Sequence, residues 1–292
     1  MRPKRLNVVG AGNVGTTLAA LWAKTSAVTV QGLWSRRVAN AERAQSVIGA
    51  GDVFAAIADL PSADVWMISV PDDIVVDVAE KISDAHACKK GQHAVVFHCS
   101  GVSDSRVLRS CRESGAYVAS VHPIHSFADP FRSIRQFAGT ACATEGDTPA
   151  LEVLDDLFHL IGGRCFSVNT EAKAHYHAST VIACNLLSAL IHSSVQCLEH
   201  AGFNRAQALV MLDSLVKGTV TNIFDVGPER ALTGPIVRGD VGTVKQHLDA
   251  LEGDERIDDV YRSLSRMALE MASHLSLETR EDLRALLEKP DE

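Results

Sequence analysis

Short apolar runs and amphipathic stretches alternate along the first half of the chain. The apolar runs predict strands at 5–10, 28–34, 53–54, 64–70, 94–98, 117–121, 139–143 and 165–168. Apolar residues at helical spacing predict helices at 14–25, 39–48, 74–82, 105–114 and 148–161. Strands that are apolar on both faces and alternate with helices of about 10–15 residues are typical of a parallel sheet covered by helices.

Beyond residue 168 the pattern becomes helical throughout. Apolar spacing predicts one long helix over 171–200 and further helices over 205–221, 240–251, 257–275 and 278–288. A segment rich in Pro and Gly interrupts them at 227–239, and Asp240 stands where an N-cap is expected. We therefore expect an α/β domain over residues 1–168 and an all-helical domain over residues 169–292.

Composition and charge narrow the class of protein. The 292 residues are 46% hydrophobic and 22% charged, which is typical of a soluble globular protein and excludes a disordered or collagen-like chain. The net charge of −8 argues against non-specific binding to nucleic acid or to an anionic membrane. We expect no apolar run near the roughly 18–20 residues of a membrane span. Gly10, Gly12 and Asn13 break the apolar stretch after the basic start, so a signal peptide is not expected.

The cysteines indicate a reducing compartment. The chain has seven of them, an odd number without any Cys-x-x-Cys pair. This pattern disfavours a disulfide framework or a zinc ribbon, and it predicts scattered free thiols in the cytoplasm.

A glycine-rich turn follows the first predicted strand. Gly10-Ala11-Gly12-Asn13-Val14-Gly15 fits G-x-G-x-x-G and opens an amphipathic helix. In this motif the first glycine allows the tight turn, the second lets the backbone approach a pyrophosphate, and the third allows close packing of helix on strand. The segment Gly10–Gly15, here called the cofactor loop, therefore predicts a dinucleotide site. The alternative is a glycine-rich turn that serves packing alone.

The end of the second strand favours NADP over NAD. An NAD site usually has Asp or Glu about 20 residues beyond the motif, where it accepts hydrogen bonds from the ribose 2′-hydroxyl. Here the sequence is Ser35-Arg36-Arg37, with no carboxylate. A hydroxyl followed by two guanidinium groups suits a 2′-phosphate. Alternatively, Arg36 and Arg37 are solvated residues at the start of a helix.

Two further strand ends belong to the same edge of the predicted sheet. Val70 and Pro71 follow the strand at 64–70, and Ser100 and Gly101 follow the strand at 94–98. Ligands of open α/β sheets lie outside the carboxyl ends of the strands. We therefore expect Val70 and Pro71 to form a wall for the cofactor, and Ser100 and Gly101 to lie nearer the nicotinamide, unless all four are ordinary loop residues.

Histidines invite a metal interpretation that the spacing disfavours. His122 follows the strand at 117–121, and His175 and His177 lie at the start of the long helix. Residues two apart are about 200° apart around a helix, so His175 and His177 cannot both face one ion. We expect no metal site and assign His122 to substrate binding.

One face of the long helix carries candidate chemistry. Lys173, His177, Thr180 and Cys184 fall within an arc of about 60° at 100° per residue, and Asn185 lies about 80° from His177. A hydride-transfer enzyme needs a cationic or proton-donating group where negative charge develops on the substrate. Lys173 and His177 are our candidates, with Ser100 and Asn185 beside them. The alternative is a surface lysine next to a histidine at the edge of the core.

The segment 231–240 is a further candidate. Gly and Pro at high density fix its backbone path, and Arg238 could bind a substrate carboxylate through paired hydrogen bonds. The alternative, which we favour slightly, is a rigid connection in which Asp240 caps a helix and Arg238 pairs with an interior carboxylate.

Together these motifs resemble those of the 6-phosphogluconate dehydrogenase-like superfamily. That group includes pyrroline-5-carboxylate reductase, ketopantoate reductase, prephenate dehydrogenase and deazaflavin-dependent NADP oxidoreductases. The closest resemblance is to a bacterial family that joins a Rossmann domain to a helical domain of unknown function. The resemblance is carried by Gly10–Gly15, 35–37, 69–72, 100–101, 122–123, 173–185 and 231–240.

This resemblance implies a helical second domain that often completes a dimer, with the active site between domains. Related dehydrogenases use a lysine on the first long helix and an asparagine one turn later. Lys173 matches the lysine, but His177 stands where the asparagine would be, and Asn185 lies two turns further on.

Our leading hypothesis is an NADPH-dependent reductase of a small carbonyl or imine compound, with a 2-keto acid resembling ketopantoate as the first substrate class to test. A non-catalytic NADP-binding sensor or assembly protein is the alternative, and a metal-dependent hydrolase would require stoichiometric metal. The apolar residues of 171–200 lie on more than one face of the predicted helix, so we also expect a homodimer formed through the helical domain.

Overall fold

The computed structural model describes residues 2–85 and 93–289. The chain divides into two compact units, Met1–Ile182 and Ala183–Glu292, and each is described by itself. Cys88 lies outside the described residues, and the other six cysteines are free thiols.

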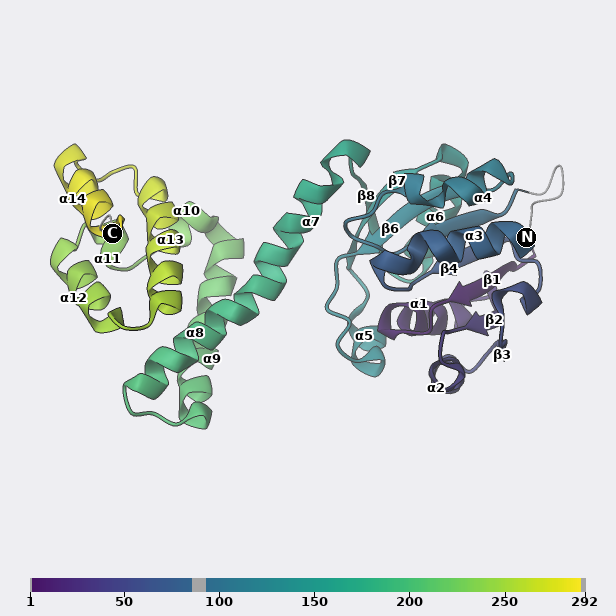
Figure 1. Cartoon of the computed structure of the whole chain (residues 1–292), viewed down its shortest axis with the longest axis horizontal. Helices are drawn as coiled ribbons and strands as arrows, with labels where there is room; N and C mark the ends of the chain where they lie inside the picture. Colours follow the sequence, from purple (N-terminus) through teal and green to yellow (C-terminus); the bar gives the residue numbers. More distant parts are fainter. Residues whose placement is uncertain (1, 86–92, 290–292) are drawn as a thin grey trace. The chain divides into compact units, whose positions relative to one another are not determined.

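The first unit is built on one eight-stranded sheet (Figure 1). Its strands are β1 (Lys4–Val9), β2 (Val28–Trp34), β3 (Asp52–Val53), β4 (Val65–Ile68), β5 (Val95–His98), β6 (Tyr117–Pro123), β7 (Ala141–Gly146) and β8 (Arg164–Ser167). They lie in the order β3-β2-β1-β4-β5-β6-β7-β8. The first six strands in this order run parallel. The chain first adds strands on one side of β1 and then, from β4 on, on its other side, as in dinucleotide-binding folds.

The apolar pattern predicts a parallel sheet. The observed sheet differs at one place, where β7 runs antiparallel to β6. The connection between them contains a helix that the pattern does not predict, α5 (Pro130–Gln136), with Pro130 at its first turn and Asp129 as its N-cap. Helix α5 packs against the helix that follows the cofactor loop and does not cross the face of the sheet. The chain therefore re-enters the sheet at the end where β6 leaves it, and β7 must run back. Strand β8 is again parallel to β7.

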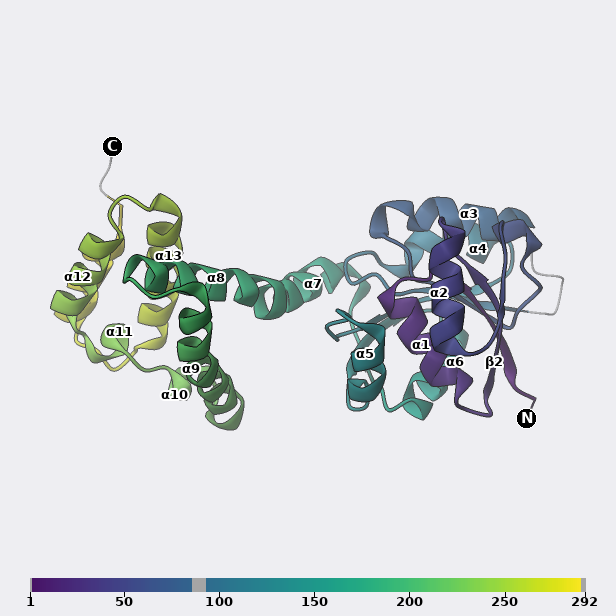
Figure 2. The same cartoon turned by 90° about the horizontal axis from the view of Figure 1, so that it is seen from below.

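Helices cover both faces of the sheet (Figure 2). On one face lie α1 (Asn13–Ala23), α2 (Val38–Ile48) and α6 (Thr148–Leu160), and on the other lie α3 (Val75–Ala85) and α4 (Arg109–Glu113). In the first layer the rings of Trp22, Phe97 and Phe158 meet edge to face, with centroids 5.2–6.4 Å apart. The Trp22 indole N–H donates to the Leu157 carbonyl at 2.8 Å, so this aromatic core leaves no indole donor unpaired.

The long helix predicted over 171–200 forms as a continuous helical segment with a change of register. It consists of α7 (Lys173–Val181), a π-helical turn at Ile182–Leu186 and α8 (Leu187–His200). The boundary between the two units falls in this turn rather than at residue 168. The reason is that α7 is fixed to the first unit through Lys173, whose side chain is buried there.

The second unit is all helical. It continues with α9 (Arg205–Val226), α10 (Pro228–Ala231), α11 (Pro235–Arg238), α12 (Val241–Leu251), α13 (Glu255–Met271) and α14 (Leu277–Leu287). The predicted interruption at 227–239 thus holds two one-turn helices. A small core joins the last four helices through Ile236, Val244, Leu248, Leu269, Leu283 and Leu287. Asp240 occupies the N-cap position of α12, but its side chain makes no capping hydrogen bond.

The helical segment Thr170–His200 corrects the expectation that no stretch could span a membrane. Its length and composition satisfy the criterion for a span, with a mean hydropathy of 1.6, and only 6% of the apolar window is buried. No Asp, Glu, Lys or Arg occurs between Lys173 and Glu199. His, Ser, Thr and Asn interrupt the apolar residues of this segment, so it contains no unbroken apolar run of that length, but they are too few to lower its mean hydropathy below that of a span. An exposed apolar helix of this kind also suits contact with another protein helix.

Candidate active site

The cofactor loop meets two other strand ends in one cavity of about 300 Å³. The loop between β1 and α1 contributes Gly10, Ala11 and Gly12. The segments after β2 and β4 contribute five further predicted residues, Ser35, Arg36, Arg37, Val70 and Pro71. The lining also includes Trp34, Asn40, Ser69 and Ile74. Three segments that the sequence assigns separately to the cofactor are thus brought together.

Close backbone packing explains two glycines of the loop. Gly10 has a φ of +108°, and a Cβ there would lie 2.5 Å from the Ser69 carbonyl oxygen. A Cβ on Gly15 would lie 2.3 Å from the Gly10 carbonyl oxygen and from Ser69 Oγ. The Ser69 hydroxyl donates to the Gly10 carbonyl at 2.6 Å. Any side chain at either glycine would therefore separate β1, α1 and β4.

Gly12 differs, because its surroundings are open. A Cβ on Gly12 would meet no described atom within 4 Å, and the residue lines the cavity. The free N–H groups at the start of α1 follow directly after it. A bare backbone beside a helix N-terminus and an open cavity fits a pyrophosphate.

The charge of the cavity also fits a phosphorylated ligand. Arg36 and Arg37 are exposed, and neither forms an ion pair with a carboxylate in the described ranges 2–85 and 93–289. The lining contains no Asp or Glu. Two guanidinium groups without an internal counter-ion can accept an anion at little desolvation cost.

Asn13 and Val14 are placed differently from the other loop residues. The Asn13 amide donates to the carbonyls of Phe127 and Ala128, at 2.7 and 3.1 Å, and so holds the segment between β6 and α5 against the start of α1. Val14 packs against the hydrophobic core. Neither side chain lines the cavity, so any contact of these two residues with the cofactor would come from the backbone.

The predicted residues Gly101, His122 and His177 meet at the carboxyl ends of β5 and β6, together with Tyr176, which the sequence does not predict. His122 at the end of β6 and Tyr176 and His177 on α7 form what we call the His–Tyr cluster. The Tyr176 hydroxyl lies 2.6 Å from His122 Nδ1, and the rings of His122 and His177 meet edge to face, with centroids 5.6 Å apart. Gly101 makes room for them, because a Cβ there would lie 2.3 Å from His177 Nδ1 and 3.0 Å from His122 Cε1.

Burial shifts the pKa of two members of this cluster. Burial first, and then the nearby His177 and Lys173, lower the pKa of His122 to about 4, against the opposing effect of Asp72. Burial raises the pKa of Tyr176 to about 12. At neutral pH His122 is therefore an uncharged imidazole and Tyr176 keeps its proton.

Lys173 lies in a buried polar network, neither on an exposed surface nor in an open cleft. Its side chain is 2% exposed, and its amino group donates to Ser120 Oγ and to Glu145 Oε1, the latter at 3.3 Å. Burial lowers the pKa of Lys173, while the Glu145 carboxylate opposes this shift. Helical spacing places Lys173 and His177 on one face of α7. The first turn of α7 packs on β6 and β7, and helical side chains lean toward the helix N-terminus. The Lys173 side chain therefore enters the buried network.

Glu145, which the sequence analysis does not single out, is the centre of this network. It is 4% exposed and accepts hydrogen bonds from Ser105 N and Ser105 Oγ, both at 2.8 Å, and from Thr170 Oγ1 at 3.3 Å. The available signal was a carboxylate two residues beyond the strand predicted at 139–143, because a carboxylate that close to a buried strand is buried only with partners. Tyr176 lies between His175 and His177 at the start of the long helix, and this position was the available signal for it.

Ser100 is part of the turn after β5. Its hydroxyl oxygen accepts from Ser103 N at 2.9 Å, and its own N–H donates to His98 Nδ1 at 3.2 Å. The other ring nitrogen of His98 bonds the Asp104 carbonyl at 3.0 Å. Burial lowers the pKa of His98 to about 4, so this histidine is a neutral structural residue that shapes the turn carrying Ser100 and Gly101.

Two predicted site residues belong to the second unit. Asn185 lies in the π-helical turn with its side chain exposed. Arg238 is also exposed and pairs with Asp240 at 3.1 Å, not with an interior carboxylate. The catalytic role of Asn185 and the substrate-binding role of Arg238 stay predictions. Over residues 2–85 and 93–289, no group of three His, Cys, Asp or Glu side chains is arranged to hold a metal ion.

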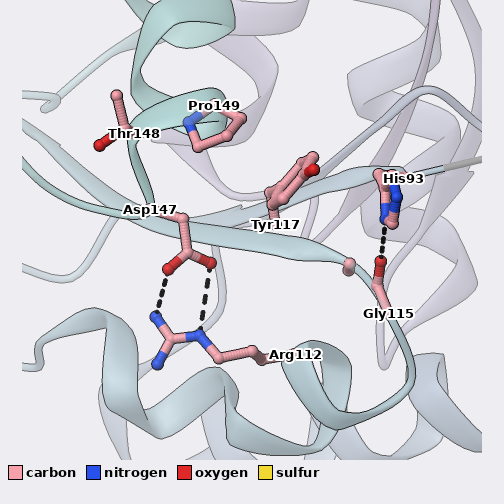
Figure 3. A pocket seen from close by; sticks show the side chains of 8 residues that line it. His93, Arg112, Gly115, Tyr117, Asp147, Thr148 and Pro149 are labelled. Atoms are coloured by element: carbon pink, nitrogen blue, oxygen red, sulfur yellow. Dashed lines mark hydrogen bonds and ion pairs between the residues drawn. The ribbon is translucent and has the colours of Figure 1, made fainter.

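Another cavity, of about 420 Å³, lies beside the amino end of β6 (Figure 3). Its charged side chains pair with each other. The Arg112 guanidinium donates to both oxygens of Asp147, at 2.9 and 3.3 Å, and Asp147 also accepts from Val118 N. His93 Nδ1 lies 2.8 Å from the Gly115 carbonyl oxygen. This arrangement ties α4 to the sheet and presents no unpaired charge to a ligand.

Two family models match the chain. Residues 1–123 match the family described as a Rossmann-like domain, and residues 140–268 match the family described as a domain of unknown function, DUF2520. The chain joins a Rossmann-like domain to a DUF2520 domain. The expected fold class and the resemblance to a family that couples these two parts are thereby confirmed. A comparison with curated proteins found no match.

Solved structures of the same fold cover nearly the whole chain. A Bacteroides fragilis protein named as a candidate NADP oxidoreductase is 21% identical over 92% of this chain and 99% of its own, with a TM-score of 0.74. A Thermotoga maritima protein is 26% identical over 92% and 98%, with a TM-score of 0.71. A reductive aminase from Aspergillus terreus, in complex with NADPH and ethyl levulinate, is 12% identical over 98% and 92%, with a TM-score of 0.60. Pyrroline-5-carboxylate reductases and imine reductases are also among the similar structures.

Proposed function

We propose that the protein is an NADPH-dependent reductase of a small substrate with a C=N or C=O bond. The observation that carries this proposal is the cavity in which the cofactor loop, the unpaired Arg36 and Arg37, and the end of β4 meet. It combines an open backbone at Gly12 with two free guanidinium groups and contains no carboxylate. Similar structures with NADP oxidoreductase, reductive aminase and imine reductase in their names support the same activity.

Each part of the cavity would hold a different part of the cofactor. The backbone of Gly10–Gly15 and the N-terminus of α1 would bind the pyrophosphate. Ser35, Arg36 and Arg37 would bind the 2′-phosphate, and Val70 and Pro71 would form an apolar wall. When bound, NADPH supplies the hydride.

We place the substrate near Gly101, His122 and His177, at the ends of the strands adjacent to β4. A C=N substrate is the first class to test, because a reductive aminase and imine reductases are among the similar structures. A 2-keto acid, which the sequence alone suggests, comes second. Ser100, Asn185 and Arg238 remain candidates for contacts with the substrate.

The test is a binding titration followed by a substrate screen. In fluorescence titrations, Arg36→Ala/Arg37→Ala should weaken NADPH binding and leave NADH binding nearly unchanged. Each lost charge-assisted contact should cost about 1.5–3 kcal/mol, and less where solvent reaches it. Arg109→Ala is the matched control, because Arg109 is an exposed arginine that pairs with Glu113 on α4 and should affect neither nucleotide.

Equal losses for both nucleotides, or no loss, would reject the assignment of the 2′-phosphate to Arg36 and Arg37. Imines, amines with carbonyl partners, and 2-keto acids should then be screened for oxidation of NADPH by its absorbance. Tight NADPH binding without oxidation by any of these compounds would favour the sensor or assembly role instead.

A further inference from the structure

Tyr176 is the one member of the His–Tyr cluster to which neither the sequence analysis nor the proposed function assigns a role. It lies on α7 one turn after Lys173, and the buried pair of Lys173 with Glu145 fixes that end of the helix to the sheet. Its hydroxyl lies 2.6 Å from His122 Nδ1, and the two rings meet edge to face with centroids 5.7 Å apart. The hydroxyl is therefore held in one position by groups from both α7 and β6.

The position of the cluster relative to the strands matters for chemistry. The cavity for the nucleotide lies at the ends of β2, β1 and β4. In sheets of this strand order, a dinucleotide lies across the carboxyl ends at the point where the order reverses, and its second half extends over the next strands. These are β4 and β5, and the cluster lies at the ends of β5 and its neighbour β6.

We propose that Tyr176 donates the proton in the reduction and that His122 restores it, an inference that rests on the proposed function. Reduction of a C=N or C=O bond leaves an electron pair on nitrogen or oxygen, and that atom takes the Tyr176 proton as the phenolic O–H bond breaks. The phenolate then receives the Nδ1 proton of neutral His122 while His122 Nε2 takes a proton from water. Over one cycle the substrate gains the proton and the tyrosine is restored. The imidazole, left as its Nε2–H tautomer, returns to the Nδ1–H tautomer by proton exchange with water, so the net proton comes from water, which leaves hydroxide in the solvent.

This assignment gives Lys173 a different role from the one its sequence position suggests. Its amino group is occupied by Ser120 and Glu145 inside the protein. Lys173 is therefore a positioning residue, which holds α7 so that Tyr176 and His177 face Gly101 and His122.

The chain contains a matched control for Tyr176→Phe. In the second unit, the Tyr261 hydroxyl lies 2.8 Å from His247 Nδ1, and these rings also meet edge to face at a centroid distance of 5.7 Å. Tyr261→Phe thus removes the same kind of hydroxyl–imidazole contact in a place to which we assign no chemistry.

The first readout needs no turnover. In NMR spectra of the ring nitrogens, addition of NADP⁺ should shift the signals of His122 and His177 and leave those of His247 unchanged. Tyr176→Phe should shift the His122 signals in the nucleotide-free protein, and Tyr261→Phe should not. If NADP⁺ binds in the fluorescence titration but moves neither His122 nor His177, the cluster is not at the reacting end and the proposal is overturned.

The second readout is kinetic, on a substrate found in the screen. Tyr176→Phe should lower kcat by about 10²–10⁴-fold, the usual contribution of a positioned proton donor, with the Kd for NADPH unchanged, and Tyr261→Phe should retain full turnover. Full turnover by Tyr176→Phe would overturn the role of Tyr176 while leaving the reductase assignment intact. Failure of the wild-type protein to bind NADPH at all would instead reject the proposed function.

Discussion

At the scale of single residues, burial separates two lysines that look alike in the sequence. Lys173 and Lys217 both lie on helices and both pair with a carboxylate, but the Lys173 side chain is 2% exposed and that of Lys217 is 74% exposed. A solvated pair gains little because water screens both charges. Removal of one partner of a buried pair leaves a charge without compensation. The sequence shows the helical spacing of Lys173 and His177, but it cannot show that Glu145 lies opposite Lys173.

We therefore predict that Lys173→Met is primarily a stability defect. It should lower the free energy of unfolding by about 3–5 kcal/mol, because it removes the cation that pairs with the buried Glu145 side chain. Lys173→Met/Glu145→Gln should recover much of this loss, since both charges are then absent. Urea unfolding monitored by circular dichroism measures both effects.

Lys217→Met is the control for this prediction and should cost less than about 1 kcal/mol. If Lys173→Met costs no more than Lys217→Met, then the Lys173–Glu145 pair does not hold α7 on the sheet, and a direct catalytic role for Lys173 returns to consideration.

At the scale of elements, the apolar pattern predicts which strands and helices form, but not always the direction in which a strand joins the sheet. The strand at 28–34 forms with its predicted bounds, and the other strands and helices of the first unit form within a few residues of theirs. The direction of β7 could not be predicted, because it depends on α5 packing beside α1. The sheet topology predicted from the sequence is enough to bring the three strand ends of the cofactor cavity together. The contact of α7 with β6 and β7 could not be predicted in this way, because it depends on tertiary contacts between segments far apart in the chain.

Asn13 links the start of α1 to the segment before α5, and removal of its side chain should have a local effect on that segment. Asn13→Ala removes both hydrogen bonds to the carbonyls of Phe127 and Ala128. We expect faster hydrogen exchange over residues 124–136 and a decrease of about 1–2 kcal/mol in the free energy of unfolding, since these bonds hold the segment before α5 on α1. Hydrogen exchange followed by mass spectrometry resolves this segment.

The control for this change is Asn204→Ala, which removes an asparagine that caps α9 in a capping box. It should accelerate exchange at the start of α9 and leave residues 124–136 unchanged. Unchanged exchange of 124–136 in Asn13→Ala would mean that other contacts suffice to hold the segment, and that Asn13 is available to the cofactor.

At the scale of the whole molecule, the two units differ in how well they bury their own helices. The first unit has a large apolar cluster on each face of its sheet. In the second unit α9 is 22 residues long, yet Ala208 is its only buried residue among those the structure describes. A helix in a self-sufficient domain normally buries a continuous apolar stripe. The second unit therefore has much apolar helix surface that its own residues do not cover.

This surface is the basis for proposing a homodimer. The exposed apolar residues lie along the middle of the 170–200 segment and along α9, and they include Ile182, Leu186, Leu190, Leu209, Val210, Met211, Leu215 and Phe224. Exposed apolar patches of this extent mark interaction surfaces. A second copy presents the same faces, so two copies can cover them by a symmetric interface.

Light scattering tests the dimer directly. The wild-type protein should have twice the mass of one chain at micromolar concentration. Met211→Glu/Leu215→Glu places two carboxylates one turn apart on an exposed face of α9 and should yield monomers, because burying an unpaired charge in an apolar interface is unfavourable. Leu277→Glu is the control at an exposed leucine of α14 and should remain dimeric. A monomeric wild-type protein would refute the dimer, and recovery of the protein in the membrane fraction would instead indicate that the 170–200 segment enters a bilayer.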